Sequence, residues 1–169
     1  MASSYRYYKE EIRGYLLEKE PNIEILDVGA GCGTYSLLLG DYFKNIDAVE
    51  VHKPNIEKYE LEKRYRKVYN KDIRDMEYDY DLVIFGDILE HLEVEEAQKV
   101  LRYAIKHSKG VLVAVPYLYE QGIVEDNVYE IHKQPDLTKE IMKERYPELR
   151  LLIGNEEYGY YINDNNTLL

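Results

Sequence analysis

The spacing of apolar and polar positions changes most sharply between residues 23 and 43. An apolar run over 23–28 is followed by a turn with three glycines at alternate positions, and a helical pattern over 34–43 starts directly after it. Strand, tight loop and helix start together direct backbone N–H groups and the positive end of a helix toward a ligand. Glycine is needed where φ is positive or where a ligand touches the backbone. The stretch predicts a loop that binds a nucleotide-like cofactor, with an ordinary strand-to-helix turn as the alternative.

The same periodicity predicts the remaining elements. Helices are expected over residues 4–19, 34–43, 55–66, 94–107 and 137–146. Strands are expected over residues 23–28, 46–51, 67–69, 82–85, 111–115, 149–153 and 158–162. The first five strands alternate with helices, which indicates a doubly wound, mainly parallel α/β sheet with right-handed crossovers. The last two strands are separated by Gly-Asn-Glu-Glu, which predicts a C-terminal antiparallel hairpin and seven strands in all.

The stretch 117–135 interrupts this rhythm. It is polar, rich in tyrosine and acids, and longer than the usual connection between elements. We expect it to be a loop on the substrate side of the fold. The chain contains no repeats, low-complexity tracts or Gly/Ser-rich linkers, so residues 1–169 are predicted to form one domain.

Polar residues gather where the predicted strands end. They are the segment 27–33, Glu50, Asp72, the pair at 86–87 and the pair at 116–117. In a doubly wound sheet the ligand lies beyond the carboxyl ends of the strands, at the switch in strand order. The sequence therefore places the functional site at this one edge.

Composition narrows the class of partner. The net charge of −11, from 33 acids against 22 bases, argues against sequence-independent binding to nucleic acid or an anionic membrane. No apolar run approaches the ~20 residues of a membrane span, and the first residues lack the apolar core of a signal peptide. With Cys32 as the one cysteine, we expect a cytoplasmic protein without disulfides. A tyrosine-rich N-terminal helix could support a homodimer.

The glycine spacing separates two classes of cofactor. A dinucleotide loop has the pattern G-x-G-x-x-G/A, but here the third glycine comes one residue early and Thr34 fills the last position. Asp27 would repel a pyrophosphate, whereas it would suit a ligand with an ammonium group and a positive sulfur. Glu50 can accept both hydroxyls of a ribose in either class. A nicotinamide-dependent oxidoreductase is the weaker alternative, because no Tyr-x-x-x-Lys pair follows the fourth or fifth strand.

Four motifs in order resemble the class I S-adenosylmethionine-dependent methyltransferases. They are Asp-Val-Gly-Ala-Gly-Cys-Gly from Asp27, Ala-Val-Glu ending at Glu50, the pair at 72–73, and Phe-Gly-Asp-Ile-Leu-Glu-His-Leu over 85–92. The resemblance covers roughly residues 23–116 and implies a Rossmann-like methyltransferase fold with S-adenosylmethionine as cofactor.

That resemblance also implies roles for individual positions. The loop would surround the methionine part, Glu50 the ribose and Asp72 the adenine amino group, with Ile73 near the ring. Asp87 and Ile88 would close the site beneath the sulfonium. The implied cofactor-binding set is Asp27, Gly29, Ala30, Gly31, Gly33, Glu50, Asp72, Ile73, Asp87 and Ile88.

Candidates for substrate chemistry lie in the stretch 117–135. If this segment is extended, Glu130 and His132 face one way and could form a base with its orienting group, or half of a metal site. His132 is the candidate base, and the alternative is a solvated loop that covers the cleft. His91 is predicted to start a helix and bond to backbone. Four scattered histidines and one cysteine make no zinc pattern, so no metal is predicted, and a metal-dependent methyltransferase that uses Asp87 and the loop acids is the alternative.

The sequence therefore predicts a small S-adenosylmethionine-dependent methyltransferase. The acidic charge and the lack of an added binding domain favour a small-molecule or peptide-like acceptor over bulk RNA or DNA. A non-catalytic S-adenosylmethionine-binding subunit of a partner enzyme is the first alternative, followed by an NAD(P)-dependent oxidoreductase.

Overall fold

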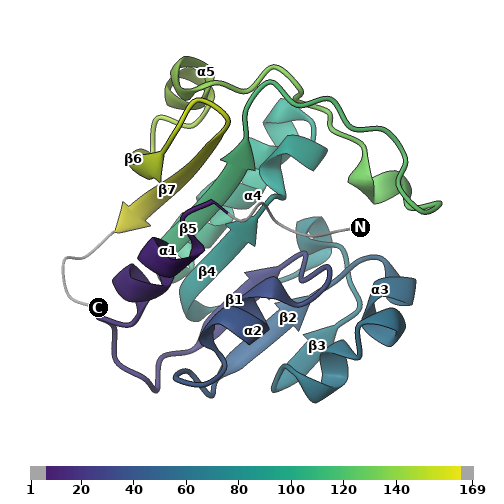
Figure 1. Cartoon of the computed structure of the whole chain (residues 1–169), viewed down its shortest axis with the longest axis vertical. Coiled ribbons are helices and arrows are strands. Elements are labelled where there is room, and N and C mark those ends of the chain that lie inside the picture. The colour runs from purple at the N-terminus through teal and green to yellow at the C-terminus, as the bar shows by residue number, and fades with distance from the viewer. Residues whose placement is uncertain (1–6, 165–169) are drawn as a thin grey trace.

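A seven-stranded sheet forms the centre of the molecule, and the computed structural model describes residues 7–164 (Figure 1). The strand order is β3-β2-β1-β4-β5-β7-β6. The strands are β1 Ile25–Val28, β2 Ile46–Val49, β3 Lys67–Tyr69, β4 Tyr80–Gly86, β5 Ser108–Pro116, β6 Arg150–Gly154 and β7 Tyr158–Asp164. The first five are parallel, and β7 inserts antiparallel between β5 and β6. The doubly wound sheet and its closing hairpin are confirmed.

Helices cover both faces of the sheet. They are α1 Lys9–Leu16, α2 Thr34–Leu39, α3 Lys53–Lys58, α4 Val94–Lys106 and α5 Lys139–Arg145. The α1, α2 and α3 helices pack on one face, whereas α4 and α5 pack on the other (Figure 1). The protein therefore has three layers, as expected for a parallel sheet buried on both sides.

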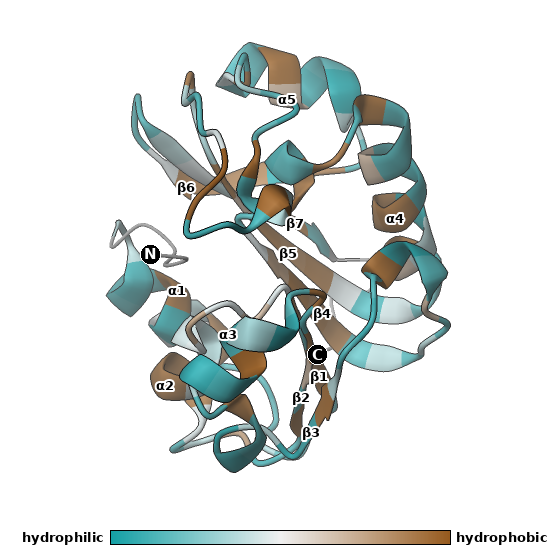
Figure 2. Cartoon of the chain, turned by 90° about the vertical axis from the view of Figure 1, so that its right-hand side faces the viewer, coloured by the Kyte–Doolittle hydropathy of each residue, from teal (hydrophilic) through white to brown (hydrophobic). Residues whose placement is uncertain are grey.

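The two hydrophobic cores follow from the period-two alternation of strand side chains. On β4, Val83 and Phe85 point into the layer with α4, while Leu82 and Ile84 point into the layer with α1 and α2. Figure 2 shows the hydrophobic colour on these central strands between helices with hydrophilic outer faces. A continuous apolar run such as 82–85 is thus a strand buried on both sides.

Several predicted elements are shorter than expected. The predicted helix 55–66 is divided into α3 and a 3-10 turn at Leu61–Lys63, because Glu60 takes the left-handed φ of 50°. The predicted helix 34–43 ends at Leu39. Of the predicted helix 4–19, residues 4–6 lie outside the described part, and α1 covers Lys9–Leu16. None of these differences moves the carboxyl end of a parallel strand, where the functional site is predicted.

The register aligns the carboxyl ends of the central strands. Val28 is the partner of Val49 on β2 and of Phe85 on β4, and Gly86 is the partner of Ala114 on β5. The loops that follow β1, β2, β4 and β5 therefore leave the sheet at one level. In the part of the chain that the structure describes, no helix is both long and apolar enough to cross a membrane.

Gly86 tests the packing at this edge. A Cβ on Gly86 would lie 2.4 Å from Cε2 of the buried Tyr35 ring on α2. Because a packed ring has little room to yield, Gly86→Ala should lower the free energy of unfolding by about 1–3 kcal/mol. Gly122→Ala is the matched control, since its Cβ meets nothing within 4 Å. Chemical denaturation of both variants measures the difference, and equal stability would contradict the packing described.

Candidate functional site

The glycine loop after β1 is shaped by backbone geometry. Gly29, Gly31 and Gly33 all take positive φ, of 67°, 53° and 80°. Gly29 N donates to the Val49 carbonyl at 2.8 Å, which ties the loop to the end of β2. A Cβ at Gly29 would lie 2.0 Å from Cδ1 of Ile88, so the loop and the segment after β4 approach closely. The loop is therefore built for close backbone approach, as its sequence predicts.

Glu50 is held in place by backbone donors. Its Oε2 accepts a hydrogen bond from Gly31 N and its Oε1 from His52 N, each at 2.8 Å. Burial raises the pKa of Glu50, and the two backbone bonds oppose that rise. A fixed carboxylate thus stands beside the glycine loop at the end of β2, within the cleft.

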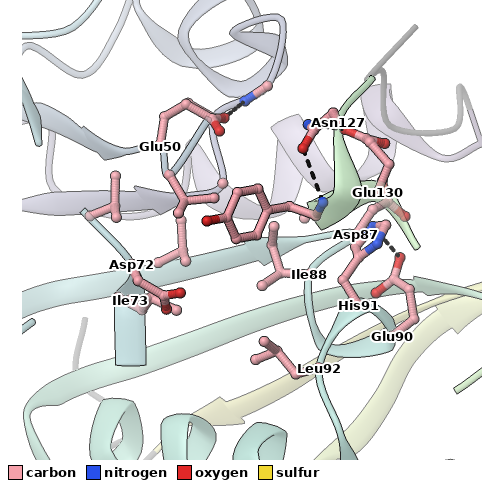
Figure 3. A pocket seen from close by; sticks show the side chains of 18 of the residues that line it. Glu50, Asp72, Ile73, Asp87, Ile88, Glu90, His91, Leu92, Asn127 and Glu130 are labelled. Atoms are coloured by element: carbon pink, nitrogen blue, oxygen red, sulfur yellow. Dashed lines mark hydrogen bonds and ion pairs between the residues drawn. The ribbon is translucent and has the colours of Figure 1, made fainter. Parts of the chain in front are cut away.

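A cleft of about 280 Å³ opens along this edge of the sheet (Figure 3). Most of the predicted cofactor-binding residues line it, namely Gly29, Ala30, Gly31, Glu50, Asp72, Ile73, Asp87 and Ile88. Both predicted substrate-side residues, Glu130 and His132, line it as well. Residues distant in sequence therefore share one cavity.

Asp27 and Gly33 do not line the cleft. Asp27 is 1% exposed and accepts a hydrogen bond from the Tyr65 hydroxyl, so its nearest partner is a buried side chain rather than the cavity. Burial raises the pKa of Asp27 to about 7, and the Tyr65 bond and the charge of Lys9 act in the opposite direction. Asp27 is therefore buried and bonded to a side chain of the protein, and its contact with a cofactor stays a prediction.

Asp72 lies at the far end of the cleft from Glu130 (Figure 3). Arg74 donates to both of its oxygens, at 3.0 Å and 2.6 Å, and also pairs with Glu96. The Arg74 guanidinium lowers the pKa of Asp72. Asp72 is therefore a charged and oriented acceptor, and the neighbouring Ile73 supplies an apolar surface in the same cleft.

The segment after β4 turns sharply. Asp87 takes the left-handed φ of 58°, its N–H donates to the Ala114 carbonyl, and its Oδ1 accepts from Tyr158 at 2.6 Å. A 3-10 turn at Leu89–His91 follows. This turn places Glu90 and His91 on the cleft, as part of its lining.

The substrate-side loop is fastened to that turn by a buried glutamine. Gln134 is 2% exposed, and its amide nitrogen donates to the Leu89 carbonyl, the Leu92 carbonyl and the Tyr146 hydroxyl. The Glu90 carbonyl in turn accepts from the N–H groups of Lys133 and Gln134. The chain after Glu130 is thereby fixed against the turn, and His132 is brought to His91.

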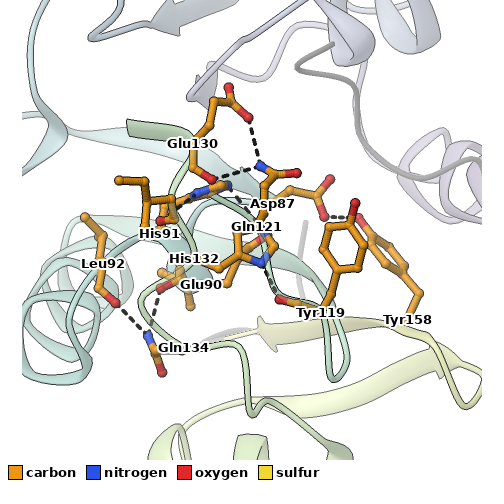
Figure 4. A network of polar contacts seen from close by, with 12 residues as sticks. Asp87, Glu90, His91, Leu92, Tyr119, Gln121, Glu130, His132, Gln134 and Tyr158 are labelled. Carbon is orange, nitrogen blue, oxygen red and sulfur yellow. Dashed lines mark hydrogen bonds and ion pairs between the residues drawn. The ribbon is translucent and has the colours of Figure 1, made fainter. Parts of the chain in front are cut away.

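The two histidines stack edge to face. Their ring centroids are 4.7 Å apart with planes at 79°, and Nδ1 of His132 lies 2.7 Å from the Tyr119 carbonyl (Figure 4). Burial lowers the pKa of His91 to about 4 and also lowers that of His132, which favours the neutral form of each ring. Neutral imidazoles can accept a proton or bind a metal ion.

Glu130 has different partners from those expected. Residues 128–130 form a 3-10 turn rather than an extended strand. The Glu130 side chain accepts hydrogen bonds from Gln121 at 3.1 Å and Asn127 at 3.4 Å, while the Tyr119 carbonyl orients His132. Glu130 thus lines the cleft beside His132 as a separate group.

Sequence reasoning pointed to Tyr119 as part of an apolar wall for the acceptor, but it missed the contributions of Glu90, Gln134, Gln121 and Asn127. Glu90 and His91 were visible in the Leu-Glu-His-Leu motif, but nothing in the sequence indicated that His132 meets them. The one available signal was that His132 and Gln134 lie just before the predicted helix 137–146. The residues that they contact depend on the path of the loop.

Comparison with known proteins identifies related folds. The sequence pattern of the methyltransferase domain matches residues 26–112. No curated protein matches the chain. A methyltransferase from Clostridium acetobutylicum ATCC 824, described as S-adenosylmethionine-dependent, has a TM-score of 0.70 at 15% identity, covering 95% of this chain and 92% of its own.

Two further structures are similar. Magnesium protoporphyrin IX methyltransferase from Synechocystis PCC 6803, solved with bound S-adenosylmethionine, has a TM-score of 0.66 at 11% identity, covering 92% of this chain and 77% of its own. The PH0226 protein from Pyrococcus horikoshii OT3 has a TM-score of 0.68 at 19% identity, covering 92% of this chain and 87% of its own. At these identities the structures show a shared fold.

The raised pKa of Asp27 makes stability depend on pH. Its folded pKa of about 7 lies above the ordinary value of 3.8, so the folded protein holds the proton more tightly than the unfolded chain. Stability from this group is therefore lost as pH rises from about 4 to 7. In the wild type this lowers the free energy of unfolding by on the order of 4 kcal/mol between pH 4 and pH 7. The Asp27→Asn variant should not show this decrease, and urea denaturation at several pH values measures the difference.

Tyr65→Phe provides the opposite change. It removes the hydrogen bond that lowers the pKa of Asp27, so the loss of stability should extend to higher pH than in the wild type. An Asp27→Asn profile as steep as that of the wild type would contradict the buried acid described.

Proposed function

The chain belongs to the methyltransferase-domain family, and from that membership we propose that it transfers the methyl group of S-adenosylmethionine to a small-molecule or peptide-like acceptor. The observation that carries the proposal is one cleft that is lined both by the glycine loop with Glu50 and by Glu130 with His132. In this proposal the described residues 7–164 act as one catalytic domain.

The residues present suit the cofactor. Gly29 and Gly31 line the cleft with main chain alone, because they take positive φ and carry no side chain. Glu50 offers a carboxylate already aligned by two backbone donors, and each of its oxygens has a further lone pair for a ribose hydroxyl. Asp72 is a charged acceptor that suits an amino group, with Ile73 beside it for an aromatic ring.

The charge of the cleft favours a cation. Its lining contains six acidic residues, Glu50, Asp72, Asp87, Glu90, Glu96 and Glu130, against three basic ones, Lys71, Arg74 and Lys133. Two of those acids, Asp72 and Glu96, are paired with Arg74. Burial raises the pKa of Glu50, Glu90 and Glu130, and a positively charged ligand beside these acids would favour their ionised forms and be attracted by them in turn.

The chemistry needed from the protein is alignment. When bound, S-adenosylmethionine supplies an electrophilic methyl group on a positive sulfur. Ile88 and the glycine loop bind and shield that end of the cleft, and Glu130 and His132 face the acceptor. Holding the two reactants in line supplies most of the acceleration for such a displacement. We expect His132 to be the residue that activates the acceptor.

The acceptor end is partly apolar. Tyr119, Val128 and Tyr129 line the cleft and are 40%, 57% and 46% exposed. Exposed aromatic and aliphatic side chains beside a catalytic cleft support an organic acceptor with an apolar part. With a net charge of −11, the surface disfavours a nucleic-acid backbone.

Calorimetry with S-adenosylmethionine tests the cofactor. The wild type should bind it, with NAD inert, and Glu50→Ala should weaken binding at least tenfold because the ribose hydroxyls would lose a buried acceptor (roughly 1–3 kcal/mol). Glu57→Ala, an exposed acid on α3, is the matched control and should bind as the wild type does. Tight binding of NAD, or unchanged affinity in Glu50→Ala, would count against the proposal.

The same cofactor with a labelled methyl group tests the acceptor class. Incubation of the purified protein with a cell extract should label the small-molecule or peptide fraction. Label found in RNA or DNA instead would overturn the acceptor class and leave the cofactor assignment intact.

A further inference from the structure

Three potential metal ligands meet at the acceptor end of the cleft. Within residues 7–164, one donor atom each from Glu90, His91 and His132 lie within 4.8 Å of one another. Nε2 of His91 is 4.0 Å from Oε1 of Glu90. Figure 4 shows these side chains converging from the turn after β4 and from the substrate-side loop. The cluster thus joins segments about 40 residues apart at a single point.

Glu90 is the second and independent observation. It is 1% exposed, and neither of its carboxylate oxygens has a hydrogen-bond partner. A buried carboxylate without donors is costly, because it has lost its water and gained nothing in exchange. A carboxylate in this position is explained if it binds a ligand. The carboxylate of Glu90, which has no hydrogen-bond partner, is the one that meets the imidazoles of His91 and His132.

The imidazoles are oriented as metal ligands usually are. Nδ1 of His132 lies 2.7 Å from the Tyr119 carbonyl, and Nδ1 of His91 lies 3.4 Å from the Ile131 carbonyl. A carbonyl oxygen only accepts, so Nδ1 of His132 carries the proton and its Nε2 keeps a lone pair, whereas the His91 ring faces the backbone carbonyls of Ile131, Glu130 and Asp87. In metal sites the ligating histidine commonly donates its other N–H to a backbone carbonyl in this way.

We propose that Glu90, His91 and His132 bind a divalent first-row transition-metal ion. Two imidazoles and one carboxylate suit ions such as Zn²⁺, Fe²⁺, Co²⁺ or Mn²⁺ rather than Ca²⁺. Ligand atoms around such an ion stand about 3.4 Å apart in tetrahedral geometry. Donors that lie up to 4.8 Å apart therefore need to approach by up to about 1.4 Å. Three protein ligands leave at least one coordination position open.

The position of the ion gives it a role that rests on the proposed function. Because the cluster lines the acceptor end of the cleft, the open coordination position faces the acceptor. Hard or borderline cations of this class bind oxygen, and a bound hydroxyl loses its proton to water more readily. The acceptor class is therefore narrowed to a molecule with a hydroxyl oxygen. In this arrangement His132 activates the acceptor hydroxyl indirectly, because it holds the ion to which the hydroxyl would bind.

Cobalt chloride is the probe for the site. Untagged full-length protein titrated with Co²⁺ should develop visible absorption with one equivalent bound. His91→Ala and His132→Ala should each weaken Co²⁺ binding by about a hundredfold or more. His107→Ala is the matched control, because that ring stacks on Tyr103 away from the cleft and its loss should leave the titration unchanged. No Co²⁺ binding, or binding that survives both variants, would overturn the metal site.

Glu90→Gln gives a test that does not depend on spectra. It keeps the shape of the side chain and removes the charge, so the variant should fold. Co²⁺ should raise the thermal midpoint of the wild type and of His107→Ala, because an ion that binds only the folded state stabilises it. The midpoint of Glu90→Gln should not move, and an equal shift in that variant would refute the assigned ligand.

S-adenosylmethionine binding, measured on the same samples, separates the two proposals. His91→Ala and His132→Ala should retain cofactor affinity within about twofold, because neither lies at the glycine-loop end. Cofactor binding without Co²⁺ binding would overturn the metal site and leave the proposed function standing. Co²⁺ binding without cofactor binding would do the reverse.

Discussion

The register of β1 with its two neighbours is the constraint on which the site depends. Val28 pairs with Val49 on one side and with Phe85 on the other, so three parallel strands end at the same level. The residues that follow each strand must leave the sheet together, and their polar groups share one edge. A slip of one residue would exchange the two faces of a strand and bury the wrong side chains in each core. The hydrophobic layers and the cleft are therefore set by the same hydrogen bonds.

Burial of acids is the recurring energetic feature of this edge. Burial raises the pKa of Asp27, Glu50 and Glu90, but their surroundings differ. A tyrosine hydroxyl meets Asp27, two backbone N–H groups meet Glu50, and no protein donor meets the carboxylate of Glu90. The first two are satisfied within the fold. In the metal site that we propose, a bound ion supplies the partner that Glu90 lacks within the fold.

The fold was predictable because its signals are local. The buried run 82–85, the glycines after β1 and the turn before β7 each specify their own geometry, and parallel topology then assembles them. Glu50, Asp72 and Asp87 could be placed in one cleft for the same reason, since each directly follows a strand or a strand end. The helix break at Glu60 was not predictable, because it depends on a single left-handed residue in a sequence of helix formers.

The hydrogen-bond partner of Asp27 and the meeting of His91 with His132 could not be predicted either. Asp27 belongs to a strand buried on both faces, and its partner Tyr65 lies 38 positions further along the chain. His132 reaches His91 because Gln134 satisfies two carbonyls of the turn after β4. Such contacts depend on the path of a long loop, which sequence spacing does not determine.

The insertion of β7 between β5 and β6 has a consequence for biosynthesis. Tyr158 at the start of β7 donates to Asp87, a residue that lines the cleft at the carboxyl end of β4, so the last strand helps to hold the turn after β4. During translation β7 emerges after every other described element, and until then β5 has an unpaired edge. Ribosome-bound chains that lack β7 therefore contain the glycine loop but not the Tyr158 hydrogen bond that holds Asp87. The order of synthesis thus leaves this part of the cleft lining without its support until the sheet is closed.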